Sequence, residues 1–222
     1  YGSTLKRYLN GNLEGSSSTS SLNTATSDFI IGQGVFSTWN TLNGKIDEVA
    51  IFNRALNTTE ISALYGGTSP NIYPSNLIAS NLNPVAYYPL GEQAQNTGYV
   101  GSGNPGSPNT LSNVWQFPNG VLQDYVMDFD GVDDLINLDN GVSLNSSGYS
   151  LSIWFNSNSF SSIQVLFTNA ASNIKFVSIN NSTTIRVRDG VNQREFTIPS
   201  LNTGLWYYLI IVVDNGNGQV YL

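Results

Sequence analysis

Four tryptophans are the residues of this sequence best suited to hold a sugar, because the C–H face of a sugar ring packs against a flat aromatic face. Trp154 and Trp206 lie inside apolar runs that predict strands, so we expect them in the core. Trp39 and Trp115 lie in predicted loops. Loop tryptophans often only cover the end of a domain, but loops also carry ligand sites. Trp39 and Trp115 are therefore the ligand-binding candidates.

The densest group of acidic residues is formed by Asp130, Asp133 and Asp134, which surround Gly131 in a short predicted turn. Carboxylate oxygens are hard ligands and suit calcium. Asp-Gly and Asp-Asp are also ordinary turn formers whose side chains bond to their own backbone. From the residues alone, a plain turn and a cation site both stay open.

A second pair of acids, Asp47 and Glu48, lies inside a predicted strand. Neighbouring side chains of a strand point to opposite faces of the sheet, so at least one of the two should be partly buried. A buried carboxylate needs a partner. Arg54, backbone amides or a cation could supply it, and we favour a salt bridge or simple exposure at a sheet edge.

The sequence lacks the residues that most catalytic sites use. It has no cysteine and no histidine. Disulfides and thiolate metal sites are therefore excluded, and so are the commonest metal ligand and the usual general base at neutral pH. A Ser or Cys triad that depends on histidine is excluded for the same reason.

The composition is that of a turn-rich globular β protein. Hydrophobic residues make up 40% and charged residues 10% of the chain, which is too apolar for disorder. The net charge of −7, with 8 scattered Lys and Arg residues, argues against nucleic acid as a partner. No apolar run approaches the ~20 residues that a membrane span needs. The chain starts at Tyr1 without an initiator Met or a signal peptide, so we interpret it as an excerpt or a processed product.

Short apolar segments with turn signals between them predict an antiparallel β-sandwich. Apolar and polar residues alternate in 184–198, which predicts a hairpin with one solvent-exposed face. Residues 205–213 are apolar on both faces, which predicts a central strand. Gly98 to Asn113 reads as a long loop. The predicted strands are 5–9, 12–15, 29–32, 45–52, 85–90, 125–129, 135–138, 151–155, 163–167, 174–179, 184–188, 194–198 and 205–213.

One short helix is predicted near residues 58–65. Asn57 and Glu60 have the spacing of a capping box, in which each side chain accepts from the backbone amide of the other. Gly66-Gly67 offers a left-handed residue that ends the helix. Pro70 and Pro74 discourage its continuation, so residues 67–83 are interpreted as a linker.

The two ends of the chain are alike. Residues 1–9 and 214–222 each have a polar, glycine-containing segment followed by an alternating strand that closes on Tyr-Leu. At the start, Tyr8-Leu9 continues into Asn10-Gly11, a type I′ hairpin signal. We interpret the likeness as an internal repeat that the chain crosses out of phase.

The sequence resembles the laminin-G-like, concanavalin A-like lectin/glucanase superfamily in its bacterial or phage style. Each motif alone is weak, but together they cover most of the chain. The motifs are Val-Ala-Tyr-Tyr-Pro-Leu at 85–90, Asp-Phe-Asp-Gly-Val-Asp-Asp at 128–134, Leu-Ser-Ile-Trp-Phe at 151–155, Leu-Trp-Tyr-Tyr at 205–208, Tyr-Leu-Asn-Gly at 8–11, and Gly-Lys-Ile-Asp-Glu-Val-Ala-Ile-Phe-Asn-Arg-Ala-Leu at 44–56. The resemblance implies an all-β, antiparallel jelly-roll β-sandwich with one short helix.

In that family the Ala-Tyr-Tyr-Pro motif comes first and the Ile-Asp-Glu-Val motif last, whereas here the closing motifs come first. Residues 1–66 therefore look like the closing half of a sandwich and residues 84–222 like the opening half, joined by the linker 67–83. Either the halves belong to successive domains of a tandem array, or one permuted sandwich is assembled from both. The duplicated Tyr-Leu strand favours the array.

The resemblance implies a calcium site at Asp130, Asp133 and Asp134, with Asp47 as a further ligand. It also raises catalysis, since glucanases share the fold. Their two carboxylates lie ~5–9 Å apart and usually alternate along a strand as Glu-x-Asp-x-Glu, a pattern that the contiguous Asp47-Glu48 does not provide. We therefore expect no enzyme.

The function implied by the resemblance is a non-catalytic module that binds a carbohydrate or another cell-surface ligand. We expect it in a repetitive extracellular, cell-surface or virion-surface protein whose neighbouring repeats or copies are further partners. The alternative is a structural filament subunit in which neighbouring copies complete each other's sandwiches.

Overall fold

The computed structural model describes residues 3–19, 29–34, 41–65, 82–88, 90, 111–115, 124–138, 148–169, 175–189 and 192–214. Within these ranges it has fourteen strands and one helix. The elements are β1 (Ser3–Leu9), β2 (Asn12–Thr19), β3 (Phe29–Ile31), β4 (Asn43–Phe52), α1 (Thr58–Tyr65), β5 (Ala86–Tyr88), β6 (Leu111–Trp115), β7 (Asp124–Asp130), β8 (Ile136–Leu138), β9 (Gly148–Ser157), β10 (Gln164–Asn169), β11 (Lys175–Asn181), β12 (Thr184–Asp189), β13 (Asn192–Thr197) and β14 (Trp206–Asp214).

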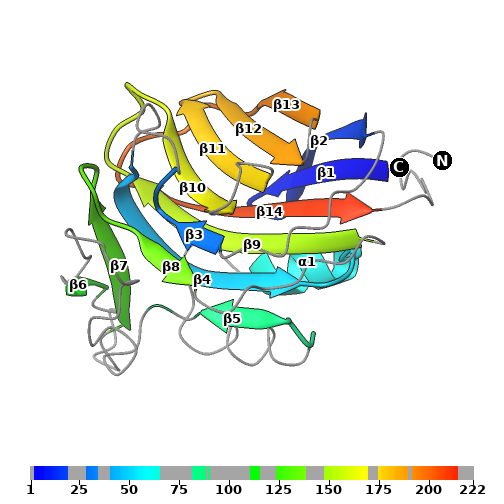
Figure 1. The fold of residues 1–222 in the computed structure, drawn as a ribbon, viewed down its shortest axis with the longest axis horizontal. Helices are drawn as coiled ribbons and strands as arrows, with labels where there is room; N and C mark the ends of the chain where they lie inside the picture. The colour runs from blue at the N-terminus through cyan, green and yellow to red at the C-terminus, as the bar shows by residue number, and fades with distance from the viewer. Residues whose placement is uncertain are drawn as a thin grey trace.

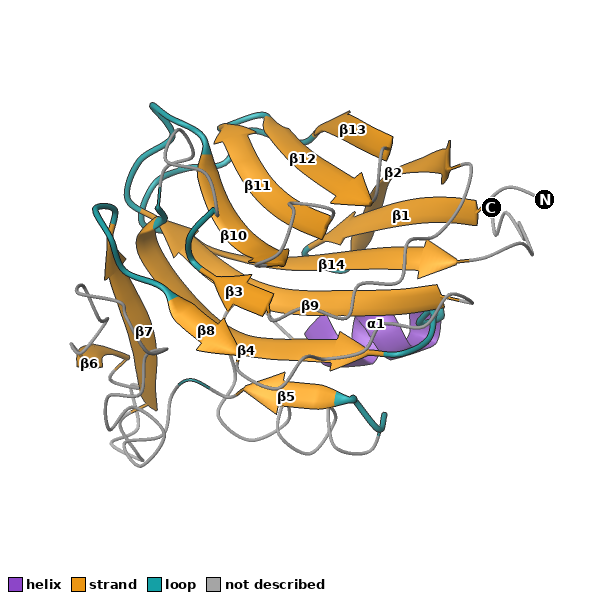
Figure 2. Cartoon of the chain, in the orientation of Figure 1, coloured by secondary structure: helices purple, strands orange, loops and turns teal. Residues whose placement is uncertain are grey.

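The strands form two antiparallel sheets that face each other as a sandwich (Figure 1). The larger sheet has the order β2-β1-β14-β9-β4-β7-β6, and β5 pairs with β4 beside this path. The smaller sheet has the order β13-β12-β11-β10-β3-β8. Figure 2 shows α1 on the outer face of the larger sheet. The predicted all-β sandwich with one short helix is confirmed.

Two apolar clusters lie on the two faces of the larger sheet. The main core lies between the sheets and draws on both, for example Leu151 of β9 and Val177 of β11. The second cluster lies on the outer face, where Ile61 and Leu64 of α1 cover Trp154 and Tyr208. The larger sheet is therefore a middle layer along β9 and β14, with apolar packing above and below.

β14 is buried along both faces, as its sequence predicts. It pairs with β9 on one side, from Trp206 opposite Asn156 to Asp214 opposite Gly148. On the other side it pairs with β1, from Thr4 opposite Asp214 to Leu9 opposite Leu209. An apolar run that faces two clusters is most stable as a central strand, where its backbone groups also find partners on both edges.

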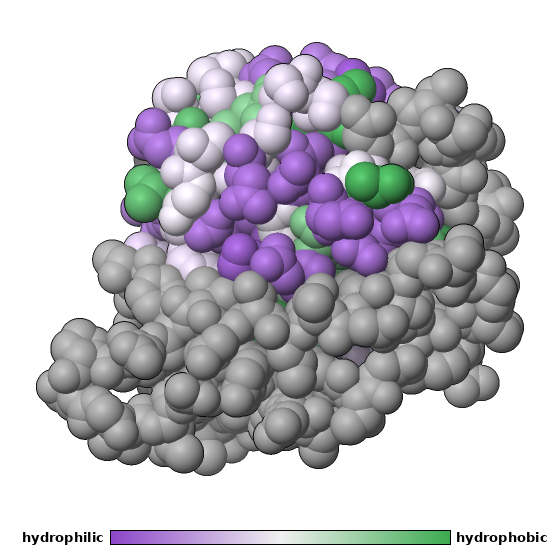
Figure 3. All heavy atoms as spheres, turned by 90° about the vertical axis from the view of Figure 1, so that its left-hand side faces the viewer, coloured by the Kyte–Doolittle hydropathy of each residue, from purple (hydrophilic) through white to green (hydrophobic). Residues whose placement is uncertain are grey.

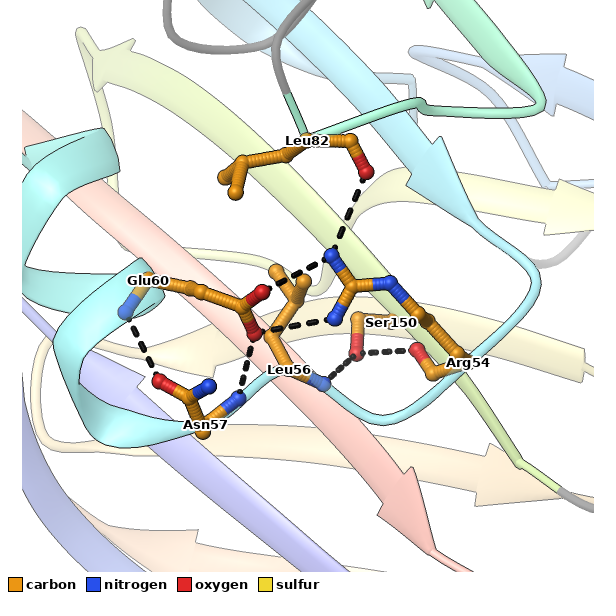
Figure 4. Close-up of polar contacts among 6 residues, drawn as sticks. All are labelled: Arg54, Leu56, Asn57, Glu60, Leu82 and Ser150. Carbon is orange, nitrogen blue, oxygen red and sulfur yellow. Dashed lines mark hydrogen bonds and ion pairs between the residues drawn. The ribbon is translucent and has the colours of Figure 1, made fainter.

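The start of α1 has the predicted capping box (Figure 4). The Asn57 side chain accepts from the Glu60 amide at 3.0 Å, and the Glu60 carboxylate accepts from the Asn57 amide at 2.9 Å. Glu60 also forms an ion pair with Arg54 at 2.9 Å. The Ser150 hydroxyl of β9 accepts a hydrogen bond from the Leu56 amide and donates one to the Arg54 carbonyl. These two bonds attach the segment before the helix to the sheet.

The first hairpin turns at Asn10-Gly11, and both residues have positive φ angles of 49° and 77°. This is the backbone that a type I′ turn needs. The Asn10 side chain accepts from the Tyr208 amide at 2.9 Å, so the turn is also attached to β14. The predicted hairpin is confirmed.

Strands from the two halves of the sequence alternate within the sandwich. β1 and β4 come from residues 1–66. β1 pairs with β14, and β4 lies between β9 and β7, and these three neighbours all come from residues 84–222. β3 likewise lies between β10 and β8. Residues 66–81, which hold most of the predicted linker, and the end segments 1–2 and 215–222 lie outside the described residues. The division at 66 and 84 stays a prediction.

The sequence did not predict β6. Leu111–Trp115 pairs with β7, although its first three residues fall in the expected loop 98–113 and Trp115 was assigned to a loop. The segment Leu-Ser-Asn-Val-Trp contains Ser and Asn, which favour turns. This segment becomes a strand because β7 offers it a partner. The strand propensity of its own residues is a weak guide at the edge of a sheet.

Arg7 is a charged residue inside the main core. It lies on the face of β1 that Leu5 and Leu9 share, and its exposed fraction is 0%. Its guanidinium lies 4.3 Å from the ring centroid of Phe196 in the other sheet, and Nη2 donates to the Thr197 carbonyl at 3.2 Å. Among the described residues, Nε and Nη1 have no hydrogen-bond partner. Burial lowers the pKa of Arg7 to about 10, because the charged form loses its hydration.

We expect Arg7→Met to raise the free energy of unfolding by about 1 kcal/mol, because a side chain of similar length removes two buried donors without leaving a cavity. Urea unfolding followed by tryptophan fluorescence measures the change. Arg7→Ala is the matched control and should destabilise the protein, since it opens a cavity. Earlier unfolding of Arg7→Met than of the wild type would contradict the prediction and show that the contacts with Phe196 and Thr197 dominate.

Candidate functional site

The turn between β7 and β8 brings together the three aspartates of the predicted acidic cluster. Asp130 ends β7, and Asp133 and Asp134 follow it. One carboxylate oxygen from each lies within 4.8 Å of the others. Figure 1 shows this turn at one end of the sandwich, on the left.

The side chains of the turn also bond to its backbone, as the turn interpretation expects. Asp130 Oδ1 accepts from the Val132 amide at 2.7 Å, and Asp134 Oδ2 accepts from the Asp130 amide at 2.9 Å. The Thr41 hydroxyl donates to the Val132 carbonyl at 2.8 Å. Gly131 has a φ of 84°, and a Cβ there would lie 2.8 Å from the Cβ of Asn43, so glycine is needed for this close approach.

Asp134 is the buried member of this cluster, and other acidic groups surround it. Asp134 is 7% exposed. Burial raises the pKa of its carboxyl, and the charges of Asp130, Asp133 and Asp128 raise it further, while the backbone bond from Asp130 lowers it. Burial and nearby like charges disfavour the charged form of a carboxyl group. A cation that binds beside such a group stabilises that charged form.

The donor set fits a calcium ion. Calcium takes oxygen ligands at about 2.3–2.6 Å, so two ligands of one ion lie no more than about 5 Å apart, which the 4.8 Å spread of the carboxylate oxygens satisfies. Asp130 and Asp134 each use one carboxylate oxygen for the backbone bonds described above and have a second oxygen. Asp130, Asp133 and Asp134 are therefore the residues that would hold the ion.

Asn43 connects the acidic turn to the loop after β9. It pairs with Asp130 across β4 and β7, and its carbonyl and side-chain oxygen accept from the amide and side chain of Asn158 at 2.8 and 3.1 Å. Its own amide donates to Gln164 Oε1 at 3.0 Å. We call the set Asn43, Asp130, Asp133, Asp134 and Asn158 the Asn43 rim.

Sequence reasoning missed Asn43 and Asn158. Each looks like an ordinary turn former, and they are 115 residues apart in the chain. The only local signal is Asn43-Gly44 ahead of a strand, which indicates a turn and not a site. Their contact follows from the pairing of β4 with β9, a long-range feature.

The end of the molecule that carries the Asn43 rim is polar. In Figure 3, which views this side, hydrophilic residues predominate among those described, and hydrophobic ones form small separate spots. Ser157, the last residue of β9, and Ser159 and Ser161 of the loop that follows are joined by hydrogen bonds, including Ser159 to Ser161 at 2.9 Å. Hydroxyl, amide and carboxylate groups at one end suit a polar ligand.

Asp47 is not part of the aspartate group found among the described residues. It lies four residues beyond Asn43 in β4, about 13 Å further along the strand at 3.3 Å per residue. It is 1% exposed, and its Oδ1 accepts from the Glu48 amide at 3.0 Å. Its role as a further calcium ligand stays a prediction that this position does not favour.

Glu48 lies at a β-bulge that the sequence did not reveal. The register between β4 and β9 shifts between Asp47 and Ala50, and Glu48 has a φ of 51°. The strict alternation assumed for Asp47 and Glu48 does not hold across a bulge, because an extra residue stands opposite one partner. Both acids are buried, so simple edge exposure is wrong, and Arg54 pairs with Glu60 instead.

The partner of Glu48 is a tyrosine of the outer-face cluster. The Tyr87 hydroxyl donates to the Glu48 carboxylate in a short hydrogen bond. Nearby, the Tyr208 and Ser152 hydroxyls are 2.9 Å apart. Burial raises the pKa of Tyr208, and the Glu48 charge raises it further. Tyr208 belongs to the outer-face cluster that α1 covers, and Tyr87 packs against this cluster.

The structure places the tryptophans differently from one another. Trp154 and Trp206 are buried in the outer-face cluster, which confirms that they are structural. Trp39 lies outside the described residues. The backbone of Trp115 pairs with Asp124, six residues before Asp130, so it is about 20 Å from the acidic turn along β7. The structure therefore does not bring Trp115 and the aspartates into one site.

We expect Tyr87→Phe to lower the free energy of unfolding by about 1–3 kcal/mol, because the buried Glu48 carboxylate loses a donor. In a Glu48→Met background, which lacks the acceptor, the same substitution should have a smaller effect. Urea unfolding of the four proteins completes a double-mutant cycle, and a coupling energy above about 0.5 kcal/mol is expected. Additive effects would show that the hydroxyl does not act through Glu48.

Comparison with known proteins identifies the family of this sandwich. Residues 1–62 and 130–222 match a family model described as the concanavalin A-like lectin/glucanases superfamily. The matched segments hold most of both sheets, including β1, β9 and β14. Searches of curated proteins and of solved structures returned no match. The described residues hold no helix long and apolar enough to cross a membrane. Because the family model covers more than half of the chain, this protein belongs to the concanavalin A-like lectin/glucanases superfamily, as a laminin-G-like member.

Proposed function

We propose that this chain is a non-catalytic module that binds a carbohydrate or a similar polar cell-surface ligand at the Asn43 rim, with the help of Ca²⁺. The observation that carries the proposal is the convergence of Asp130, Asp133 and Asp134 within 4.8 Å. Asn43 lies opposite Asp130 across β4 and β7, and its side-chain oxygen accepts from the side chain of Asn158 at the same polar end of the sandwich. We further propose that the module belongs to an extracellular, cell-surface or virion-surface protein, as the laminin-G-like resemblance implies.

The two parts of the rim have different tasks in this proposal. Asp130, Asp133 and Asp134 would hold a calcium ion, which would neutralise their charge and could also bind ligand hydroxyls, since calcium takes six to eight oxygens. Asn43 and Asn158 orient the ligand, because an amide both donates and accepts and so matches a hydroxyl. The backbone bonds of Asp130 and Asp134 keep the carboxylates in place before the ligand arrives.

The arrangement of acids supports binding without catalysis. Glycoside hydrolysis needs two carboxylates that face a scissile bond from opposite sides. The three acids of the rim all lie within one short turn, residues 130–134, and two of them accept hydrogen bonds from backbone amides. Asp47 and Glu48 lie in the bulge of β4, where both are buried and bonded.

We expect millimolar Ca²⁺ to raise the Tm of the wild-type protein and chelator to reverse the rise, because a ligand that binds only the folded state stabilises it by about 2.7 kcal/mol at a hundred times its Kd. Asp133→Asn should remove most of the shift. It is the best single change, since Asp130 and Asp134 hold the turn. Asp214→Asn, at the end of β14, is the matched control and should keep the shift. An unchanged Tm of the wild type would reject the calcium site.

We expect a glycan array to show binding in Ca²⁺ that is lost both in chelator and in Asp133→Asn, because the ligand contacts the ion. Asn158→Ala should weaken binding and leave the calcium-dependent Tm shift in place, since its amide contacts the ligand and not the ion. Absence of glycan binding together with regular polymers of the purified chain would favour the filament alternative. Hydrolysis of a β-glucan that Glu48→Gln abolishes would reject the non-catalytic proposal.

A further inference from the structure

Two arginines close one side of the sandwich. β2 is the last strand of the larger sheet and β13 the last strand of the smaller one, and the two strands lie next to each other (Figure 1). Among the described residues, the hydrogen bonds that cross this side come from Arg7 of β1 and Arg194 of β13. We call this side the arginine seam, and define it by these two arginines together with Gly15, Ser17 and Thr197.

The strand registers direct both arginines into the seam. Residues directly opposite each other in an antiparallel pair have side chains on the same face of the sheet. Arg7 faces the core and lies opposite Gly15 of β2, and Ser17 comes two positions later on the same face. In the smaller sheet, Arg194 lies opposite Val187, which is a core residue. Both guanidinium groups therefore reach the seam from the inner faces of the two sheets.

Small residues of β2 leave room for the two guanidinium groups. A Cβ on Gly15 would lie 3.4 Å from Nη2 of Arg7 and 3.3 Å from Cδ1 of Phe196, so a larger residue would press on both. At the next inward position, the Ser17 hydroxyl accepts from Nε of Arg194 at 2.8 Å. Two residues of a strand are about 7 Å apart. The two guanidinium groups are therefore neighbours at about this spacing.

The positive charge of the seam is only partly compensated. Arg54 and Arg186 each form an ion pair with a glutamate, whereas neither Arg7 nor Arg194 forms one with a described residue. The chain has 15 acidic and 8 basic residues, so a shortage of acids is not the cause. The charge of Glu14 raises the pKa of Arg7, but burial lowers that pKa more. The seam is thus a local site of positive charge in an acidic protein.

Both arginines have hydrogen-bonding capacity that a negative ion would use. Arg7 is 0% exposed, and its Nε and Nη1 have no partner among the described residues. Arg194 is exposed, and its bonds go to the neutral oxygens of Ser17, Ser18 and Gln193. A buried cation with unused donors is costly, and a charged oxygen binds a guanidinium more strongly than a neutral one. These properties suit a small anion.

We propose that the arginine seam binds a free tetrahedral oxyanion, sulfate or phosphate, between Arg7 and Arg194. Each oxygen of such an ion accepts from a guanidinium at about 2.7–2.9 Å, so the ion with one bond at each end spans about 8 Å. This span matches the spacing of the two groups. The exposed Arg194 side chain leaves Ser17 to admit the ion, and Arg7 is the inner donor. A free ion fits better than a group carried by a polymer, because Arg7 is 0% exposed.

We expect about 10 mM sodium sulfate to raise the Tm of the wild type above its value in sodium chloride of equal ionic strength, since a ligand of the folded state stabilises it. Arg7→Met and Arg194→Gln should each remove most of this difference. In calorimetric titrations they should weaken sulfate binding about tenfold or more, because each removes a bond to a charged group. Arg186→Gln is the matched control, since that arginine is paired with Glu195, and it should behave as the wild type.

A second measurement uses the wild type alone. The ¹H–¹⁵N resonance of Arg7 Nε should shift in a saturable way with added sulfate, while that of Arg54 stays in place. Equal Tm rises in all four proteins would overturn the proposal, because sulfate also stabilises proteins through their whole surface. An unmoved Arg7 resonance would overturn it too, and much tighter binding of a sulfated oligosaccharide would overturn the assignment to a free ion. Every measurement uses calcium-free buffer, so this proposal and that for the Asn43 rim fail separately.

Discussion

The fold depends on the burial of β14 on both of its faces. Leu209 and Ile211 face the core between the sheets, while Tyr208 and Ile210 face the cluster under α1. A strand of this kind needs a layer on each side and a partner on each edge. The smaller sheet and α1 supply the layers, and β9 and β1 supply the edges. The helix, the sandwich and the meeting of both halves of the sequence all satisfy this one requirement.

The same constraint separates the polar chemistry into two places. Along β4, the bulge at Glu48 buries two acids where apolar packing surrounds them, so Tyr87 and a backbone amide must serve the carboxylates. At the end of the sandwich, the turn after β7 leaves Asp130 exposed and Asp133 partly exposed near Asn43, with Asp134 buried beneath them. Buried carboxylates with fixed partners stabilise a strand, whereas acids at a polar rim remain available to a cation. The rim is therefore the better candidate for function.

Local patterns predicted much of this protein. The capping box of Asn57 and Glu60, the Asn10-Gly11 turn and the central position of 205–213 follow from spacings of a few residues, and the structure has all three. The acidic turn was also visible, because its aspartates are neighbours in the chain. Two predictions were wrong. Asp47 and Glu48 do not alternate between the faces of the sheet, because β4 has a bulge opposite β9. Trp115 is not in a loop, because its segment pairs with β7 as an edge strand, and that pairing depends on the neighbouring strand.

The sequence by itself determined the family, the all-β sandwich and the aspartates that could bind a cation, because these depend on residue type and short spacing. Only the tertiary structure decided that Asn43 and Asn158 join the aspartates in one rim and that Trp115 lies away from it. It also decided that β1 lies beside β14 within one chain. These are pairings between strands over a hundred residues apart, and their register is set by burial of whole faces, which no local stretch of sequence contains.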